Sequence, residues 1–226
     1  MFSFEHLIFN QHSLLVKRMS RFKRLFEEMA SEKAPGPSPT FSLFHLLRAL
    51  EVISEKPIGR GKLARSLNVG EGTVRTIIER LQSFGLSETS KAGCVLTQKG
   101  LKVLKKYQSI FAGKANVEKS EIAFGKYNFA VLVKDGGRRV GSGVEQRDAA
   151  IKVGARGATS CVFKHGHLTI PGVSDDAPED FPRAAAQILR LLQPSQNDAV
   201  VVVSAEDSVT AVYGAMAAAW TLLEDC

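Results

Sequence analysis

The segment from Pro57 to Leu86 constrains the fold more than any other stretch, because its apolar residues repeat with the spacing of two short helices joined by a tight turn. The apolar faces of the two helices consist of Leu63, Ala64, Leu67, Val74, Ile77, Ile78 and Leu81. Ala64 is small enough for the second helix to cross closely, and Val69 is expected to anchor the turn. Gly85 ends the second helix. The pattern predicts two packed helices with one face left for contact.

The residues outside this core predict what the free face contacts. The polar positions of the two helices are Arg60, Lys62, Glu71, Thr73, Arg75, Thr76 and Arg80. The N-terminal part of such a second helix can enter the major groove of DNA, where its free amides also meet phosphate. We expect Arg75 to read guanine, because a guanidinium can donate two parallel hydrogen bonds to O6 and N7. Thr73 and Thr76 suit phosphate or a thymine methyl group.

A short hairpin and a further helix follow. Leu86–Ser90 and Cys94–Thr97 are predicted strands joined by Lys91-Ala92-Gly93, which places the positive charge of Lys91 at the tip. Thr97-Gln98-Lys99-Gly100 then begins a helix that continues to about Tyr107. We therefore expect Lys91 to contact DNA beside the second helix.

At this point the chain resembles the winged helix-turn-helix family. The matching elements are Leu-Ala-x-x-Leu at 63–67, Gly-Thr-Val-Arg at 72–75, Leu-x-x-x-Gly-Leu at 81–86 and Leu-Thr-x-x-Gly at 96–100, which cover under a third of the chain. The arrangement is also similar to archaeal winged-helix proteins with a C-terminal α+β domain of unknown function. The resemblance implies a two-domain transcription regulator that binds double-stranded DNA. Winged helices also serve as protein–protein interaction modules and as appendages on enzymes, including some archaeal riboflavin kinases.

The charge distribution favours the DNA-binding interpretation. The first 113 residues contain 18 Lys and Arg against 9 Asp and Glu, a net of +9, whereas residues 114–226 contain 12 against 14, a net of −2. Phosphate neutralisation needs cations only on the docking domain. The basic excess therefore predicts a polyanion-binding module joined to a module of another kind.

Three regions are predicted along the chain. Residues 1–39 contain a basic amphipathic helix at 12–32, which packs on the next domain or dimerises, and the Pro-rich linker 34–39. Glu27, Glu28 and Glu32 argue against an anionic membrane as its partner. Residues 40–113 form the winged domain, beginning with a helix at 41–54 capped by Thr40. Residues 114–226 form an effector-binding or dimerisation domain.

The second half alternates strand and helix signals, so the fold class is α+β. Strands are expected at 127–134, 138–140, 160–164, 168–171 and 199–204, and helices at 144–154, 181–192 and 207–223. Tight turns between neighbouring strands indicate a small sandwich with a mostly antiparallel sheet and helices on one face. The order is either hairpin-helix-hairpin-helix or a ferredoxin-like βαββαβ arrangement.

A glycine-rich turn before the helix at 144–154 is the sharpest local signal in this half. Backbone amides at such a turn can hold a small anionic effector; the candidate residues are Arg138, Gly141, Ser142, Gly143, Gln146 and Arg147. Alternatively, Ser142 caps the helix and Arg147 pairs with Asp148 on the surface. The small residues of the final helix also suit close helix packing in a dimer: Ala211, Gly214, Ala215, Ala217, Ala218 and Ala219.

Other classes of function find less support. Three widely spaced cysteines and five histidines offer no ligand pattern, so we expect no metal and no cofactor. The acidic loop at 175–180 lacks a partner base, which argues against an enzyme. Polar residues interrupt the apolar start at 1–16, so neither a signal peptide nor a membrane span is expected. We expect a cytoplasmic, homodimeric, DNA-binding transcription regulator; an enzyme of the small-molecule kinase or transferase type with a winged-helix appendage is the alternative.

Overall fold

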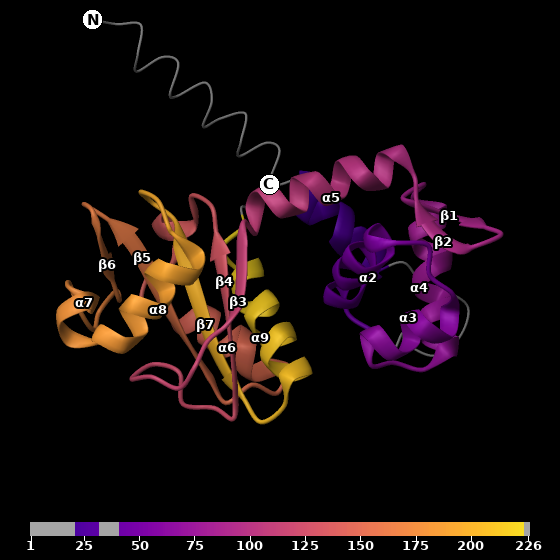
Figure 1. Ribbon diagram of the computed structural model, residues 1–226. Coiled ribbons are helices and arrows are strands. Elements are labelled where there is room, and N and C mark those ends of the chain that lie inside the picture. The colour runs from indigo at the N-terminus through magenta and orange to yellow at the C-terminus, as the bar shows by residue number, and fades with distance from the viewer. Residues whose placement is uncertain (1–20, 32–40, 224–226) are drawn as a thin grey trace, which may run out of the picture. The chain divides into compact units, whose positions relative to one another are not determined.

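The computed structural model describes residues 21–31 and 41–223, which divide into two compact units on either side of the Tyr107–Gln108 bond (Figure 1). Residues 21–31 are helical. The first unit continues with α2 (Leu43–Glu55), α3 (Arg60–Leu67), α4 (Glu71–Ser83), β1 (Ser87–Ser90), β2 (Gly93–Leu96) and α5 (Gln98–Ile110). This division falls within the last turn of α5, whereas the predicted boundary at 113/114 lies six residues later, inside β3 (Gly113–Asn116), which joins the sheet of the second unit.

The predicted helix-turn-helix is confirmed. All seven apolar residues expected at its core are buried, and α3 and α4 are joined through Asn68, whose left-handed φ of 54° turns the chain. Val69 is half-buried rather than fully enclosed. The helix before it begins after Ser42, whose backbone N–H donates to Nδ1 of His45 at 3.1 Å. The predicted cap, Thr40, lies outside the described residues.

The junction between α4 and the hairpin is fixed by backbone contacts. Gly85 adopts a left-handed φ of 68°, and the N–H of Leu86 donates to the carbonyl of Leu81 at 2.7 Å. The Thr97 hydroxyl donates to the carbonyl of Gly85 at 2.7 Å. A Cβ at Gly100 would lie 2.0 Å from the carbonyl oxygen of Leu86, so α5 can pack this closely only with glycine there.

The hairpin pairs Ser87 with Leu96 and Ser90 with Gly93, and Lys91 and Ala92 form its turn. Ile58 adds a bridge to Cys94, with backbone hydrogen bonds of 3.1 and 2.9 Å. The hairpin is therefore tied to the chain immediately before α3, which holds it beside the helix pair.

Residues 21–31 pack as an integral part of the first unit. Phe22, Phe26 and Met29 are buried, and the ring of Phe22 stacks on Tyr107 with centroids 6.2 Å apart. Packing is thus the role that the structure shows for this part of the amphipathic helix. The rest of the predicted helix and the Pro-rich linker lie outside the described residues.

The second unit contains a five-stranded sheet in the order β3-β4-β7-β5-β6, in which every neighbouring pair is antiparallel. Its strands are β3, β4 (Tyr127–Val133), β5 (Gly157–Lys164), β6 (His167–Thr169) and β7 (Ala199–Ala205). Its helical segments are η1 (Gly136–Arg139), α6 (Val144–Lys152), α7 (Ala177–Asp180), α8 (Pro182–Leu192) and α9 (Ser208–Trp220). The α+β class with an antiparallel sheet is confirmed.

Helices cover both faces of this sheet, so the expectation of helices on one face was wrong (Figure 1). Ala184, Ala185 and Ile188 of α8 pack on Val200 and Val202, whereas α6 and α9 lie against the opposite face. All seven residues of β7 are buried. Burial on two faces explains why this strand is a continuous apolar run instead of an alternating one.

The ferredoxin-like βαββαβ arrangement was wrong, whereas two antiparallel strand pairs separated by helices follow the hairpin-helix-hairpin-helix alternative along the chain: β3-β4, α6, β5-β6 and α8. β7 is the last strand in the sequence, yet it lies between β4 and β5. The expected strand at 138–140 is replaced by η1, where the N–H of Gly137 donates to the carbonyl of Asn197 at 2.8 Å and a Cβ at Gly137 would lie 2.6 Å from Val162 Cγ1. This close packing holds the segment against the end of the sheet as a turn.

The small residues of α9 are not available as a dimer surface, which corrects that expectation. All six are buried. A Cβ at Gly214 would lie 3.0 Å from Val203 and 3.1 Å from Ala155, so these residues allow α9 to approach its own sheet and the end of α6. The exposed large apolar residues of the second unit lie elsewhere, three of them on or directly after α6: Phe124, Tyr127, Val144, Ile151, Val153, Val173 and Leu191.

Candidate nucleic-acid interface

The start of each helix in the helix-turn-helix is open to solvent. Gly59 caps α3 and Gly70 caps α4, and neither helix has a side-chain cap. A Cβ added at Gly59, Gly70 or Gly72 would meet no atom within 4 Å. The starts of both helices therefore lack a side-chain cap that an approaching anion would have to displace.

The predicted contact residues other than Arg80 lie on the surface of this unit. Arg60, Lys62, Glu71, Arg75 and Lys91 are exposed, and Thr73 and Thr76 are half-buried. The hydroxyl of Thr76 donates to the carbonyl of Gly72 at 3.4 Å. The outward row on α4 consequently combines the exposed cationic side chain of Arg75 with two short hydroxyl side chains.

Arg80 is the exception and corrects the sequence analysis. Its side chain is 4% exposed and donates to the backbone carbonyls of Met29 and Ala30, the latter at 3.0 Å. Its guanidinium also lies 5.1 Å from the ring centroid of Phe41. Arg80 therefore joins α4 to the end of the helix at 21–31 and is absent from the surface that could meet DNA.

A groove runs between α4 and the hairpin, with an apolar floor of Ile58, Ile78 and Cys94. Its polar rim includes Arg60, Arg75, Glu79, Gln82 and Thr89. Arg75 Nε donates to Glu79 Oε1 at 2.9 Å, and Gln82 Nε2 donates to Thr89 Oγ1 at 2.8 Å. The first of these bonds joins two residues of α4, and the second joins α4 to the hairpin.

Glu79, Gln82 and Thr89 are rim residues that the sequence analysis missed. Glu79 and Gln82 follow Arg75 at four and seven positions, the spacing that places residues on one face of a helix. That spacing could have identified both. Thr89 carries no such signal, because its contact with α4 depends on how the hairpin folds back.

The hairpin turn is stabilised by Ser90, whose hydroxyl donates to the carbonyl of Gly93 at 2.8 Å and accepts from the N–H of Ala92 at 3.2 Å. Lys91 occupies the turn and is exposed. The result is a compact strand pair that carries one cation at its tip, attached to α4 through Gln82.

The first unit has the element order α2-α3-α4-β1-β2-α5, so the hairpin directly follows the second helix of the helix-turn-helix. Residues 42–111 match the family model described as the CggR N-terminal DNA binding domain. Residues 42–107 form a winged helix-turn-helix domain. In this domain α4 is the second helix of the helix-turn-helix, and the β1–β2 hairpin is the wing. Residues 124–222 match a second model, described as a domain of unknown function (DUF4443).

The chain is similar to the hypothetical protein PH0730 from Pyrococcus horikoshii OT3, with 29% sequence identity and a TM-score of 0.61 over 78% of this chain and 91% of that one. A MarR family protein from Mycobacterium tuberculosis, solved alone and in complex with DNA, aligns at 17% and 16% identity with a TM-score of 0.29 in both cases. These alignments cover 47% and 48% of this chain and 72% and 75% of those chains. No curated protein matches the chain.

The candidate effector residues of the second unit differ in burial and in side-chain partners. Gln146 is fully buried, and its Nε2 donates to Thr221 Oγ1 at 2.8 Å, so it cannot contact a ligand from solvent. Arg147 pairs with Asp148 at 3.3 Å on the surface. Gly143, with a φ of 79°, caps α6 in place of Ser142. Arg138, Gly141 and Ser142 are exposed.

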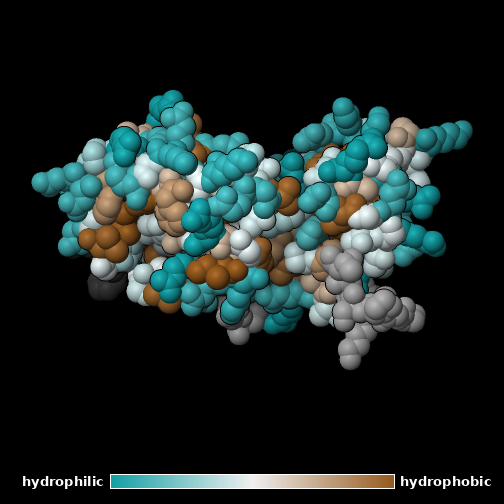
Figure 2. Space-filling view, turned by 90° about the horizontal axis from the view of Figure 1, so that it is seen from below, coloured by the Kyte–Doolittle hydropathy of each residue, from teal (hydrophilic) through white to brown (hydrophobic). Residues whose placement is uncertain are grey.

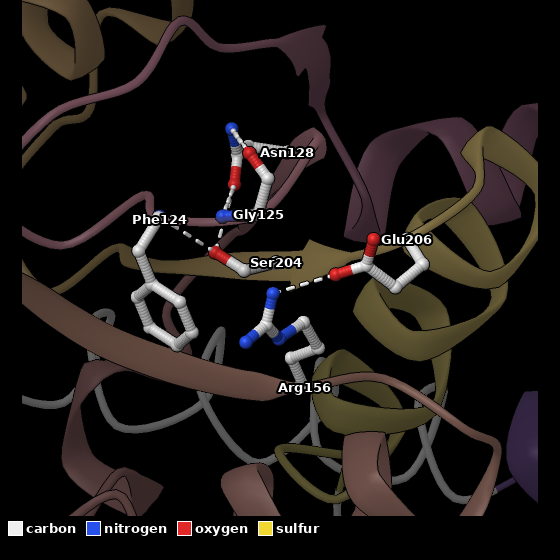
Figure 3. Close-up of polar contacts among 6 residues, drawn as sticks. All are labelled: Phe124, Gly125, Asn128, Arg156, Ser204 and Glu206. Atoms are coloured by element: carbon white, nitrogen blue, oxygen red, sulfur yellow. Dashed lines mark hydrogen bonds and ion pairs between the residues drawn. The ribbon is translucent and has the colours of Figure 1, made fainter.

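The polar network in Figure 3 has a structural role in the second unit. Ser204 Oγ donates to Asn128 Oδ1 at 2.8 Å, and the same oxygen accepts from the N–H of Gly125 at 2.9 Å. The N–H of Phe124 donates to Ser204 Oγ at 3.1 Å. The network pins the loop before β4 onto paired strand residues, while Arg156 and Glu206 form an exposed ion pair of 2.6 Å beside it.

The visible surface is mostly hydrophilic, with several hydrophobic patches among the polar side chains (Figure 2). Within the described part of the chain, no helix is both long and apolar enough to cross a membrane. Among the same residues, no group of three or more histidine, cysteine or acidic side chains is placed to hold a metal ion.

Proposed function

We propose that this protein is a sequence-specific transcription regulator that binds double-stranded DNA through the winged-helix domain. The observation that carries the proposal is the exposed row of α4, bordered by Arg60 and by the wing, in a domain that matches a DNA-binding family. The open starts of α3 and α4 supply amides for phosphates, and the wing tip supplies Lys91. The net charge of +9 in the first 113 residues supports the same partner.

Two substitutions separate base reading from phosphate contact. The test uses a duplex that the wild-type protein selects from a randomised pool, followed by fluorescence polarisation on that duplex and on single-base variants. Arg75→Ala should lower discrimination at one base pair by roughly tenfold or more, because a bidentate arginine–guanine pair is lost. Lys91→Ala should weaken binding to all duplexes alike. It should also reduce the slope of log K against log salt concentration by about one, because one phosphate contact is lost.

Lys152→Ala is the matched control, since Lys152 is an exposed cation on α6 of the second unit. It should leave every duplex affinity unchanged. If Arg75→Ala and Lys91→Ala were as silent as this control, the docking of α4 and the wing on DNA would be wrong.

The regulator is proposed to act as a homodimer. One winged helix reads only a few base pairs, and paired half-sites raise affinity and specificity together. Sedimentation of the full chain with a selected duplex should give two protein copies per duplex, with half-sites about 10 base pairs apart or a multiple of that. A single copy on a single half-site would contradict dimeric binding.

The second unit is proposed to sense a small anion at the start of α6. Support comes from the absence of a side-chain cap on α6 and from exposed Arg138 and Ser142 on the preceding turn. Isothermal titration against nucleotides, amino acids and phosphorylated metabolites should show binding of one of these anions that Arg138→Ala weakens. No heat with any of them would refute the sensing site.

A further inference from the structure

Arg75, the proposed base-reading residue, is exposed and forms an ion pair with a neighbour on the same helix. Its side chain is 69% exposed and that of Glu79 is 56% exposed, and they meet at 2.9 Å through Arg75 Nε. Long side chains on a helix ordinarily lean toward its N-terminus. The bond to a residue four positions later draws the guanidinium the other way, along α4 and into the rim of the groove beside the wing.

The atom used in this bond decides which donors stay free. A guanidinium has five N–H donors in a fixed plane, and Glu79 takes the one on Nε. The two terminal nitrogens remain unoccupied by Glu79 and can face a guanine end-on with two parallel hydrogen bonds. A carboxylate at this position also repels phosphate, so it discourages the arginine from moving to the DNA backbone.

We infer that Glu79 is a positioning residue that holds Arg75 for base reading and thereby sets specificity at one base pair. The inference rests on the proposed DNA-binding function. An exposed ion pair of this kind adds little to stability in water, because solvent screens it and both side chains lose freedom. The ion pair instead orients the guanidinium of Arg75, and its electrostatic attraction becomes stronger when DNA excludes water from it.

Glu88 provides the matched control, because it is another exposed acid of the same domain, on β1. The wild-type protein first selects a duplex from a randomised pool, and affinities are then measured for that duplex, its single-base variants and a scrambled duplex. Circular dichroism and urea unfolding confirm that each variant is folded.

Glu79→Ala and Glu88→Ala should both tighten binding to the scrambled duplex, since each removes a negative charge near phosphates. Only Glu79→Ala should lower discrimination, by about tenfold, at the same base pair that Arg75→Ala affects. Glu79→Gln keeps an acceptor for Arg75 Nε and should retain most of the discrimination. Equal effects of Glu79→Ala and Glu88→Ala on every duplex would overturn the inference.

A double-mutant cycle separates positioning from direct reading by Glu79. In the Arg75→Ala background, Glu79→Ala should cause no further loss of discrimination. A further loss would show that Glu79 contacts a base itself and would overturn its assignment as a positioning residue. A wild-type protein that selects no sequence would overturn the proposed function, and this inference with it, whereas the other contrary outcomes leave DNA binding intact.

Discussion

Arg75 and Arg80 lie five positions apart on α4 in opposite surroundings. Arg80→Ala should lower the free energy of unfolding by about 3 kcal/mol, because it removes a buried charged donor and leaves the carbonyls of Met29 and Ala30 without it. Arg75→Ala should change that free energy by less than about 0.5 kcal/mol, as is usual for surface positions. Urea unfolding of both variants checks this contrast, and equal losses would contradict it.

Gly100 is a residue whose replacement tests the packing of α5. Gly100→Ala would place a methyl group 2.0 Å from the carbonyl oxygen of Leu86, and it should cost about 2 kcal/mol or more because backbone must move. Gly72→Ala is the control, since its Cβ meets nothing within 4 Å and alanine favours helix. If urea unfolding showed Gly100→Ala to be as stable as the control, the close approach of α5 to Leu86 would be incorrect.

The core residues of the helix-turn-helix were predictable because their spacing encodes burial directly. The misplacement of Arg80 has a physical reason. A polar residue beside core positions Ile77 and Leu81 suits the surface unless another element covers it, and the covering carbonyls belong to a helix some 50 residues earlier. Glu79 differs from Arg80, because its bond to Arg75 is local and the four-residue spacing was enough to predict it.

The start of α2 carries a pH-sensitive contact. Burial lowers the pKa of His45, which favours in the folded chain the neutral imidazole, whose Nδ1 accepts from the N–H of Ser42. The unfolded chain takes up this proton near the ordinary pKa of about 6.5. Protonation therefore favours unfolding, and stability should fall as the pH drops from 7.5 through 6.5 to 5.5.

His45→Gln checks the assignment of this pH dependence, since glutamine at the same position still accepts from Ser42 and does not titrate. Thermal or urea unfolding at pH 7.5 and 5.5 should show a smaller loss for the variant than for the wild-type protein. An identical loss in both would mean that other groups carry the pH dependence.

Elements with long periodic patterns were predictable, and short or long-range features were not. α8 and β7 lie within one or two residues of their expected bounds, because many positions repeat. β3 and η1 have four residues each, too few to show a period. The position of β7 between β4 and β5 depends on pairing between distant segments, which local spacing does not encode.

At the scale of the whole molecule, the two units differ in charge as well as in fold. The winged-helix domain lies in the part of the chain with a net charge of +9, and the unit with the antiparallel sheet lies almost wholly in the part with −2. Only the first is suited to neutralise phosphates. DNA affinity should therefore follow substitutions of exposed cations in the first unit and not those of the second.

The most direct test of this account measures binding of the full chain to a labelled duplex at about 50 mM and 200 mM salt. If six or more phosphates are neutralised by cations of the winged-helix domain, affinity should fall by roughly a thousandfold between the two concentrations. Absence of binding at the lower salt concentration, or binding that salt leaves unchanged, would contradict the account.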